Sequence, residues 1–207
     1  MMYRVFAQGM LQTNCIVLQR DGNCVVVDCA YGSSDVESYI ARNSLNLVAV
    51  LLTHGHFDHC GGVQHLLQSC GNGKDIPVFV GQKDLLLAQN ASKNRWHIPA
   101  RDCFPTQTLS EGRFSVDNFS FDVLETPGHT AGSVCYVCED ILLCGDTLFR
   151  NSVGRTDFPE SQPLQLKQSL QKLCSLQKNY TLLCGHGQMS TLDSEKKNNP
   201  YLYDITH

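Results

Sequence analysis

Thr53-His54-Gly55-His56-Phe57-Asp58-His59 comes directly after the apolar run Val48-Ala49-Val50-Leu51-Leu52. A short apolar run bounded by polar residues is typical of a buried β-strand, so this strand would end in four potential metal ligands within six positions. Three imidazoles and a carboxylate so close together are costly to desolvate in an ordinary core, whereas zinc and non-haem iron prefer histidine and aspartate as ligands. The segment therefore predicts a metal site at a strand end, with an ordinary surface loop as the alternative.

The 207 residues are enough for one substantial core, and no linker rich in Pro, Gly or Ser divides them, so we predict a single domain over residues 1–207. The net charge is −4, 17% of the residues are charged, and no Lys/Arg cluster suggests a nucleic-acid surface. The apolar runs are too short to cross a membrane, and the start, Met1 to Gly9, turns polar too early for a secretory signal. We therefore expect a cytoplasmic protein, a monomer or small homo-oligomer, that acts on a small molecule and binds neither nucleic acid nor a membrane.

Eleven cysteines are scattered through the predicted strands. Because the number is odd and the chain is too large to need disulfide bonds for stability, we expect most of them to be buried reduced thiols. Cys135 and Cys138 are the one pair with a suggestive spacing. They lie three positions apart in a strand pattern, so their side chains would point to opposite faces, which argues against a shared metal ion or a redox pair.

Strand and helix patterns occur in both halves of the chain. Strands are predicted over residues 3–7, 14–19, 23–28, 47–52, 77–80, 119–125, 133–138, 141–144 and 180–184. Helices are predicted over residues 34–43, from about 60 to 70, 82–90 and 162–174. Residues 91–113 are polar and irregular and predict a loop of a length that is often functional. This order predicts an α/β protein, an αββα sandwich of two mixed β-sheets that pack face to face and are flanked by helices.

Three further segments end a strand pattern in a glycine turn and a potential ligand. Leu142-Leu143-Cys144-Gly145-Asp146 and Leu182-Leu183-Cys184-Gly185-His186 differ only in the last residue, and Glu125-Thr126-Pro127-Gly128-His129 follows the same plan. A rigid sheet can present ligands at one edge in this way. A single histidine is more often a hydrogen-bonded structural residue than a ligand, but five of the eight histidines lie at these strand ends. Together they favour a metal centre.

The spacing within the histidine-rich segment separates its ligands into two pairs. His54 and His56 are two residues apart in extended backbone, so they point the same way and can hold one ion. Asp58 and His59 are adjacent at the start of a helix, and they cannot converge on that same ion without strain. We therefore expect a second ion beside the first, and a carboxylate could bridge the two ions with its two oxygens.

These residues and spacings resemble the metallo-β-lactamase superfamily, from Leu11-Gln12-Thr13-Asn14-Cys15 near the start to Asn199-Pro200 near the end. The resemblance implies the metallo-β-lactamase fold and two divalent metal ions, zinc in the first place, with iron or manganese as alternatives. It also implies the ligands, which are His54, His56 and His129 for the first ion, Asp58, His59 and His186 for the second, and Asp146 as the bridge. The ligand motif is specific for the fold and says little about the substrate.

Two segments resemble the short, bacterial-type branch of the glyoxalase II group, the hydroxyacylglutathione hydrolases. They are Gly145-Asp146-Thr147-Leu148-Phe149 and Gly154-Arg155-Thr156-Asp157-Phe158-Pro159. Longer enzymes of that group carry an extra C-terminal helical domain that helps to hold glutathione, and we expect this chain to lack it because 21 residues follow His186. The resemblance implies that Arg155 binds the substrate, and its pairing with Asp157 is the alternative.

The activity that the resemblance implies is hydrolysis of a glutathione thioester such as S-lactoylglutathione to D-lactate and glutathione. Two divalent ions that share a water lower its pKa toward neutrality, and the resulting metal-bound hydroxide would attack the thioester carbonyl while the thiolate leaves. The catalytic residues would be Asp58, which could accept the proton of the water, and Asp146, which would hold the two ions at the required separation.

Other functions could use the same residues. A mono-iron persulfide dioxygenase that acts on glutathione persulfide would need only His54, His56, His129 and Asp146. A lactone, β-lactam or phosphodiester hydrolase relies on the same metal chemistry. A non-catalytic metal-binding module is the remaining alternative, and it is disfavoured because structural zinc sites are closed by four ligands and are seldom paired through a carboxylate.

Overall fold

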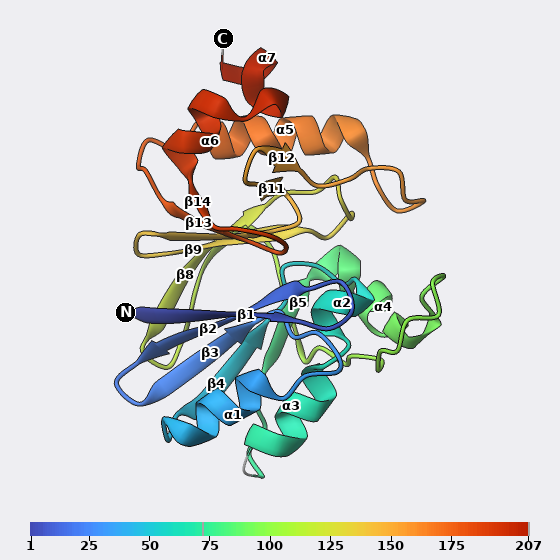
Figure 1. Cartoon of the computed structure of the whole chain (residues 1–207), viewed down its shortest axis with the longest axis vertical. Coiled ribbons are helices and arrows are strands. Elements are labelled where there is room, and N and C mark those ends of the chain that lie inside the picture. Colours follow the sequence, from blue (N-terminus) through green and yellow to red (C-terminus); the bar gives the residue numbers. More distant parts are fainter. Residues whose placement is uncertain (72, 207) are drawn as a thin grey trace.

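The computed structural model describes residues 1–71 and 73–206, and it shows two six-stranded β-sheets that lie face to face between two outer layers of helices (Figure 1). One sheet comes from each half of the chain, and they are called the N-terminal sheet and the C-terminal sheet below. Each sheet contains both parallel and antiparallel neighbours. The predicted αββα sandwich of mixed sheets is confirmed.

The N-terminal sheet follows the order of the sequence, with β1 (Met2–Gln8), β2 (Thr13–Arg20), β3 (Asn23–Val27), β4 (Asn46–Leu51), β5 (Val78–Gly81) and β6 (Gln107–Leu109). β1 to β3 form an antiparallel meander, and the pairs from β3 to β6 are parallel. Parallel neighbours need crossover connections, which include α1 (Asp35–Arg42) and α3 (Val63–Cys70). These two helices cover the outer face of the sheet (Figure 1).

The C-terminal sheet has the spatial order β14 (Ser190–Thr191), β13 (Thr181–Cys184), β10 (Ile141–Gly145), β9 (Val134–Cys138), β8 (Phe119–Glu125) and β7 (Gly112–Val116). Its outer face carries α5 (Pro163–Cys174), α6 (Leu192–Asn198) and α7 (Tyr203–Thr206) (Figure 1). β10 and β13 are parallel neighbours, so their carboxyl ends meet at one edge of the sheet. The residues that follow these two strands therefore emerge side by side.

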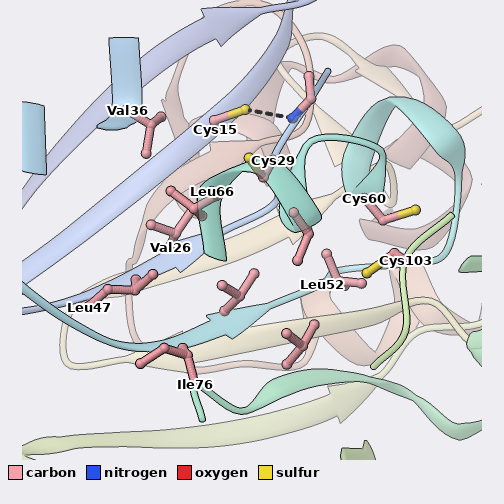
Figure 2. Packing of buried hydrophobic residues seen from close by; sticks show 14 of the residues in the cluster. Cys15, Val26, Cys29, Val36, Leu47, Leu52, Cys60, Leu66, Ile76 and Cys103 are labelled. Atoms are coloured by element: carbon pink, nitrogen blue, oxygen red, sulfur yellow. Dashed lines mark hydrogen bonds between the residues drawn. The ribbon is translucent and has the colours of Figure 1, made fainter. Parts of the chain in front are cut away.

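Alternate residues of each inner strand fill two apolar layers. Val25 and Val27 of β3 point toward the C-terminal sheet, whereas Val26 points toward α1 and α3. Figure 2 shows the outer layer, in which Val26 lies near Leu47 and Leu66. Burying an aliphatic side chain of this kind contributes roughly 1.5–3 kcal/mol, so these layers hold the strand ends rigidly in place.

Two hydrogen bonds fix the end of β4 against the C-terminal sheet. The hydroxyl of Tyr136 donates to the carbonyl oxygen of Leu52 at 2.7 Å, and the N–H of Val134 donates to the carbonyl oxygen of Thr53 at 2.8 Å. Both bonds lie directly before His54, so the histidine-rich segment leaves β4 from a fixed point.

The structure corrects three local predictions. The helix expected from about residue 60 is divided into α2 (Phe57–Cys60) and α3, and between them the N–H of Gly62 donates to the carbonyl oxygen of Cys29 at 2.9 Å, outside the helix. The helix expected over 82–90 is a 3₁₀ turn, η1 (Gln82–Asp84), followed by the short α4 (Leu85–Ala88). The loop expected over 91–113 contains the 3₁₀ turn η2 (Ala91–Lys93), β6 and the first residues of β7. These strand residues are mostly exposed and polar, so they show no alternating apolar pattern in the sequence.

The remaining short elements are β11 (Leu148–Phe149), β12 (Ser152–Val153) and the 3₁₀ turn η3 (Pro200–Leu202). All eleven cysteines are free and nine of them are buried, which confirms the expectation of reduced thiols. Cys135 packs in the layer under α5 and Cys138 packs between the sheets, so the pair points to opposite faces as predicted. No helix in the described part of the chain is long and apolar enough to cross a membrane.

Candidate metal centre

Four connections that follow strands bring the predicted ligands to one edge of the sandwich. His54 and His56 follow β4, Asp58 and His59 lie on α2, and His129, Asp146 and His186 follow β8, β10 and β13. Four of the imidazoles are buried, with His59 at 0% exposure and His56 at 7%. The structure thus places all seven residues, which are far apart in the sequence, around one point between the two sheets.

The first cluster consists of three imidazole nitrogens. His56 Nδ1 lies 3.0 Å from His54 Nε2 and 2.9 Å from His129 Nε2. These three nitrogens converge closely enough to bind one metal ion together. The geometry agrees with the prediction that His54 and His56 point the same way, and it adds His129 to that pair.

The second cluster consists of Asp58, His59 and His186. The Nε2 atoms of His59 and His186 lie 3.3 Å apart, and Asp58 Oδ2 lies 3.3 Å from His186 Nε2 and 3.5 Å from His59 Nε2. These atoms also converge closely enough for one ion. The histidine-rich segment is therefore divided between two clusters, as its spacing predicted.

Asp146 lies between the two clusters and reaches both. Its Oδ1 lies 3.4 Å from His59 Nε2, and its Oδ2 lies 3.5 Å from His129 Nε2. Oδ1 is buried and has no hydrogen-bond partner among the described residues. A buried carboxylate oxygen without a partner is costly, and a cation would satisfy it. A Cβ atom at Gly185 would lie 2.1 Å from this oxygen, so the glycine turn after β13 is what lets the carboxylate come so close.

The outer ring nitrogen of every imidazole in the centre has a partner that fixes its tautomer. His129 Nδ1 and His186 Nδ1 lie 2.9 Å and 3.1 Å from the carbonyl oxygens of Arg155 and Leu11, which can only accept a hydrogen bond. Both Nδ1 atoms therefore carry the hydrogen, and each Nε2 is free to bind a metal ion. Holding the outer nitrogen in this way orients a histidine ligand and raises its basicity.

Asp28 holds the outer nitrogens of two further histidines, and sequence reasoning missed it. Its Oδ2 lies 2.8 Å from His59 Nδ1 and accepts the hydroxyl hydrogen of Thr53 at 2.7 Å. Because that hydroxyl already donates to Asp28, its oxygen accepts from His54 Nδ1 at 3.1 Å. The signal was present in the sequence, because Asp28 follows the apolar run Val25-Val26-Val27 just as the ligands follow theirs.

Glu160 and Asp84 are two other carboxylates that the sequence did not reveal. Glu160 Oε1 lies 2.9 Å from the outer nitrogen of His56, Nε2. Asp84 is buried and accepts hydrogen bonds from the N–H groups of Gly55 and Gly132 at 2.8 Å and 2.7 Å. It therefore ties the His54–His56 segment to the loop that carries His129.

Burial and neighbouring charges shift the pKa values of the ligands in different directions. Burial and the surrounding imidazoles hold the pKa of His54 well below its usual value, so it is neutral and can bind a metal ion. Burial lowers the pKa of His59 too, but Asp58, Asp146 and Asp28 outweigh it and raise the pKa to about 10. Burial raises the pKa of Asp58, but His59, His186 and Thr13 outweigh it and bring the pKa below its usual value. The metal-free centre therefore holds a proton where a cation would otherwise lie.

A cavity of about 420 Å³ opens onto the centre. The ligands His56, Asp58, His129, Asp146 and His186 contribute to its lining. Most of the rest is apolar, and comes from Leu11, Phe57, Trp96, Ile98, Phe149, Val153 and Phe158. Small-molecule sites have this character, an apolar cavity with a few convergent polar groups.

Arg155 also lines the cavity, and its side chain is 60% exposed. Its guanidinium forms two hydrogen bonds of 2.6 Å to the carboxylate of Asp157 and lies 4.5 Å from the centre of the Phe158 ring. The pairing with Asp157 that was the alternative interpretation is thus present. It does not remove Arg155 from the cavity wall, because an ion pair exposed to solvent is weak and Arg155 can exchange Asp157 for another carboxylate.

Comparison with known proteins identifies relatives over almost the whole chain. Residues 9–186 match the family model of the metallo-beta-lactamase superfamily. The probable metallo-hydrolase YqgX of Bacillus subtilis is 32% identical over 213 residues, and the alignment covers 98% of each chain. The hydroxyacylglutathione hydrolase GloC of Haemophilus influenzae is also 32% identical, and the alignment covers 92% of this chain and 93% of GloC.

Two solved structures share the fold. The B3 metallo-beta-lactamase BLEG-1 superposes with a TM-score of 0.90 at 32% identity, covering 98% of this chain and 100% of that one. TTHA1623, solved in a di-iron-bound form, superposes with a TM-score of 0.87 at 32% identity, covering 96% of this chain and 100% of that one.

Proposed function

This chain belongs to the metallo-beta-lactamase superfamily and is a metallo-hydrolase of that fold, and we propose that it hydrolyses glutathione thioesters such as S-lactoylglutathione. The observation that carries the proposal is the pair of ligand clusters joined by Asp146 at the base of the apolar cavity. The relative named hydroxyacylglutathione hydrolase supports the choice of substrate. The products would be D-lactate and glutathione. In this proposal a single domain performs the reaction and binds neither a membrane nor a nucleic acid.

We assign His54, His56 and His129 to one divalent ion, Asp58, His59 and His186 to a second, and Asp146 to both. The donor set of imidazoles and carboxylates suits zinc and also iron, and the unpartnered Oδ1 of Asp146 points to a cation that satisfies it. The di-iron form of TTHA1623 shows that a relative with 32% identity accepts iron. When bound, divalent ions lower the pKa of a water molecule and polarise a carbonyl group.

Asp58 is placed to take the proton that the attacking water loses. Its Oδ2 accepts a hydrogen bond from the hydroxyl of Thr13 at 2.9 Å, which fixes the carboxylate at the cavity wall. Its lowered pKa keeps it ionised at neutral pH. In the proposed reaction the water oxygen bonds to the acyl carbon, the carbon–sulfur bond breaks, and glutathione leaves as a thiolate. Thiols are acidic enough to leave without a general acid.

The cavity wall has an apolar part and a charged part, which would contact different parts of the substrate. Trp96 and Phe158 stack edge to face with ring centres 5.4 Å apart, and they would enclose the groups next to the carbonyl. Arg155 stands beside Phe158 and would bind a carboxylate of glutathione in exchange for Asp157. Because that contact binds ground state and transition state alike, Arg155→Ala should raise KM about tenfold and leave kcat nearly unchanged.

The proposal is tested with protein reconstituted separately with zinc and with iron, its metal content measured, and S-lactoylglutathione as the substrate. We expect turnover that a chelator abolishes and that the added metal restores. Parallel assays use a chromogenic β-lactam and, in an oxygen electrode, glutathione persulfide. Negligible thioester turnover in protein that holds two ions would sink the proposal, and oxygen uptake with the persulfide would assign the chain to the dioxygenase branch instead.

A further inference from the structure

His56 is turned differently from the other histidines of the centre. The other four direct Nε2 inward, whereas His56 directs Nδ1 inward, toward His54 Nε2 and His129 Nε2. Its Nε2 therefore points outward, where it meets Glu160 Oε1 at 2.9 Å. Within residues 1–71 and 73–206, Glu160 is the recorded hydrogen-bond partner of this nitrogen.

We propose that Glu160 is a positioning residue for the first metal ion, because it holds His56 in the tautomer and orientation in which Nδ1 can bind that ion. A carboxylate accepts the hydrogen of Nε2–H, and this leaves the lone pair on Nδ1. It also makes the imidazole a stronger donor. The inference rests on the proposed function only in taking His54, His56 and His129 as a metal site.

The loop that carries Glu160 is fastened to the segment that carries His129. The hydroxyl of Ser161 donates to the carbonyl oxygen of His129 at 2.6 Å, and the N–H of Gln162 donates to the carbonyl oxygen of Gly128 at 2.7 Å. His129 Nδ1 in turn donates to the carbonyl oxygen of Arg155, at the start of the same loop. Residues 155–162 thus hold two of the three imidazoles of the first cluster at once, one through backbone contacts and the other through Glu160.

Phe158 fixes the faces of the same two imidazoles. Its ring centre lies 5.3 Å from that of His56, at an interplanar angle of 89°, and 5.7 Å from that of His129. The ring limits how far His56 can rotate, while the carboxylate of Glu160 selects which nitrogen keeps the hydrogen. Rotation and tautomer are thus controlled by two residues of one loop.

Glu160 complements Asp28 in this respect. Asp28 supports His59 directly and His54 through Thr53, whereas the outer nitrogen of His56 has Glu160 as its recorded partner. Glu160 is not part of the cavity lining, so it acts through His56 and not on the substrate. Its loss should therefore weaken metal binding and lower kcat without raising KM.

Two variants separate the hydrogen bond from the charge. Glu160→Ala removes both, and Glu160→Gln keeps the chain length and an acceptor oxygen but removes the charge. Glu111→Gln is the matched control, since it makes the same chemical change at an exposed glutamate that pairs with Lys172. The probe is Zn²⁺ alone, added to the metal-free full chain in competition with a chromophoric chelator.

We expect Glu160→Ala to weaken the binding of one of the two zinc ions about 10–100-fold and Glu160→Gln to weaken it about fivefold, with Glu111→Gln within twofold of the original chain. In zinc-saturated protein, Glu160→Ala should lower kcat and leave KM unchanged, the opposite of Arg155→Ala. The inference would be overturned if Glu160→Ala bound both zinc ions with affinities within twofold of those of the original chain. If that variant does not fold, Glu160→Gln decides, and unchanged affinity there is equally contrary.

The zinc measurement is independent of any substrate. If every protein binds zinc as expected but none hydrolyses thioesters, the proposed function fails and the role of Glu160 stands. If thioesters are hydrolysed but Glu160→Ala binds zinc normally, the proposed function stands and the role of Glu160 fails.

Discussion

Asp28→Asn should weaken metal binding at both ligand clusters although Asp28 belongs to neither of them. The Asp28 carboxylate is 1% exposed and accepts three hydrogen bonds, from the N–H of Thr53 at 2.8 Å, the hydroxyl of Thr53 at 2.7 Å and His59 Nδ1 at 2.8 Å. An Asn side chain has the same shape, but one oxygen becomes an NH₂ group that can only donate. His59 could then satisfy it only by accepting at Nδ1, which would leave the ring hydrogen on Nε2, the atom that faces the centre.

The magnitude follows from counting the bonds that Asn cannot keep. The bond from the Thr53 N–H survives at the remaining oxygen, and at least one of the other two is lost. A hydrogen bond to a charged group contributes about 1.5–3 kcal/mol, so metal-free Asp28→Asn should lose about 2–3 kcal/mol of unfolding free energy. Loss of an outer carboxylate partner typically lowers metal affinity about 10–100-fold, or roughly 1.4–2.7 kcal/mol at each affected site.

Two measurements check these values. Urea unfolding of the metal-free proteins, followed by circular dichroism, gives the change in stability, and zinc competition with a chromophoric chelator gives the affinities. Asp75→Asn is the matched control, because Asp75 is exposed and the chemical change is the same. If Asp28→Asn unfolded at the original urea concentration and kept both zinc affinities, the role assigned to Asp28 would be refuted.

Three further predictions follow from the pKa values. Because His59 in the metal-free protein has a pKa of about 10, zinc binding at pH 7 should release a proton into a weakly buffered indicator solution, and binding without release would contradict this. The stability that this charge gives the metal-free fold should be complete below pH 6.5 and lost as the pH rises toward 10, so a metal-free protein equally stable at pH 6 and pH 10 would be contrary. Burial raises the pKa of Cys24 to about 12 and of Cys135 to about 11, so Ellman's reagent at pH 8 should reach only the half-buried Cys70 and Cys174 before unfolding; rapid labelling of all eleven thiols in the folded protein would contradict the burial.

The ligand positions could be predicted because each of them is encoded locally. An apolar run followed by a ligand, with or without a glycine turn, marks a strand end in a way that a single sequence reveals, as at Leu142–Asp146 and Leu182–His186. The division of His54 and His56 from Asp58 and His59 followed from backbone periodicity alone. The same pattern could have identified Asp28 as a site residue, because a carboxylate directly after a buried strand needs a buried partner.

Glu160 was beyond sequence reasoning. It lies 104 residues from His56 in an irregular loop, and nothing in Phe158-Pro159-Glu160-Ser161 indicates what it contacts. The orientation of His56, with Nδ1 inward, depends on side-chain torsions that no residue pattern encodes. β6 was missed for a related reason, because a three-residue exposed strand at the edge of a sheet has no buried face to impose an apolar alternation.

The contrast between ligands at strand ends and supporting residues in irregular loops explains why the chemistry of this protein is easier to infer than its substrate. All seven proposed ligands follow β4, β8, β10 and β13 or lie on the short helix α2 after β4, and hydrogen bonds between the strands fix these strand ends to each other. Trp96, Arg155, Phe158 and Glu160 come from irregular loops whose course depends on contacts made after folding. A change in those loops can alter the cavity, the charge at its mouth or the support of His56 while the ligand set stays in place. Variation of substrate within one metal-binding fold is the expected consequence, since rigid strand ends hold the ions and adjustable loops surround them.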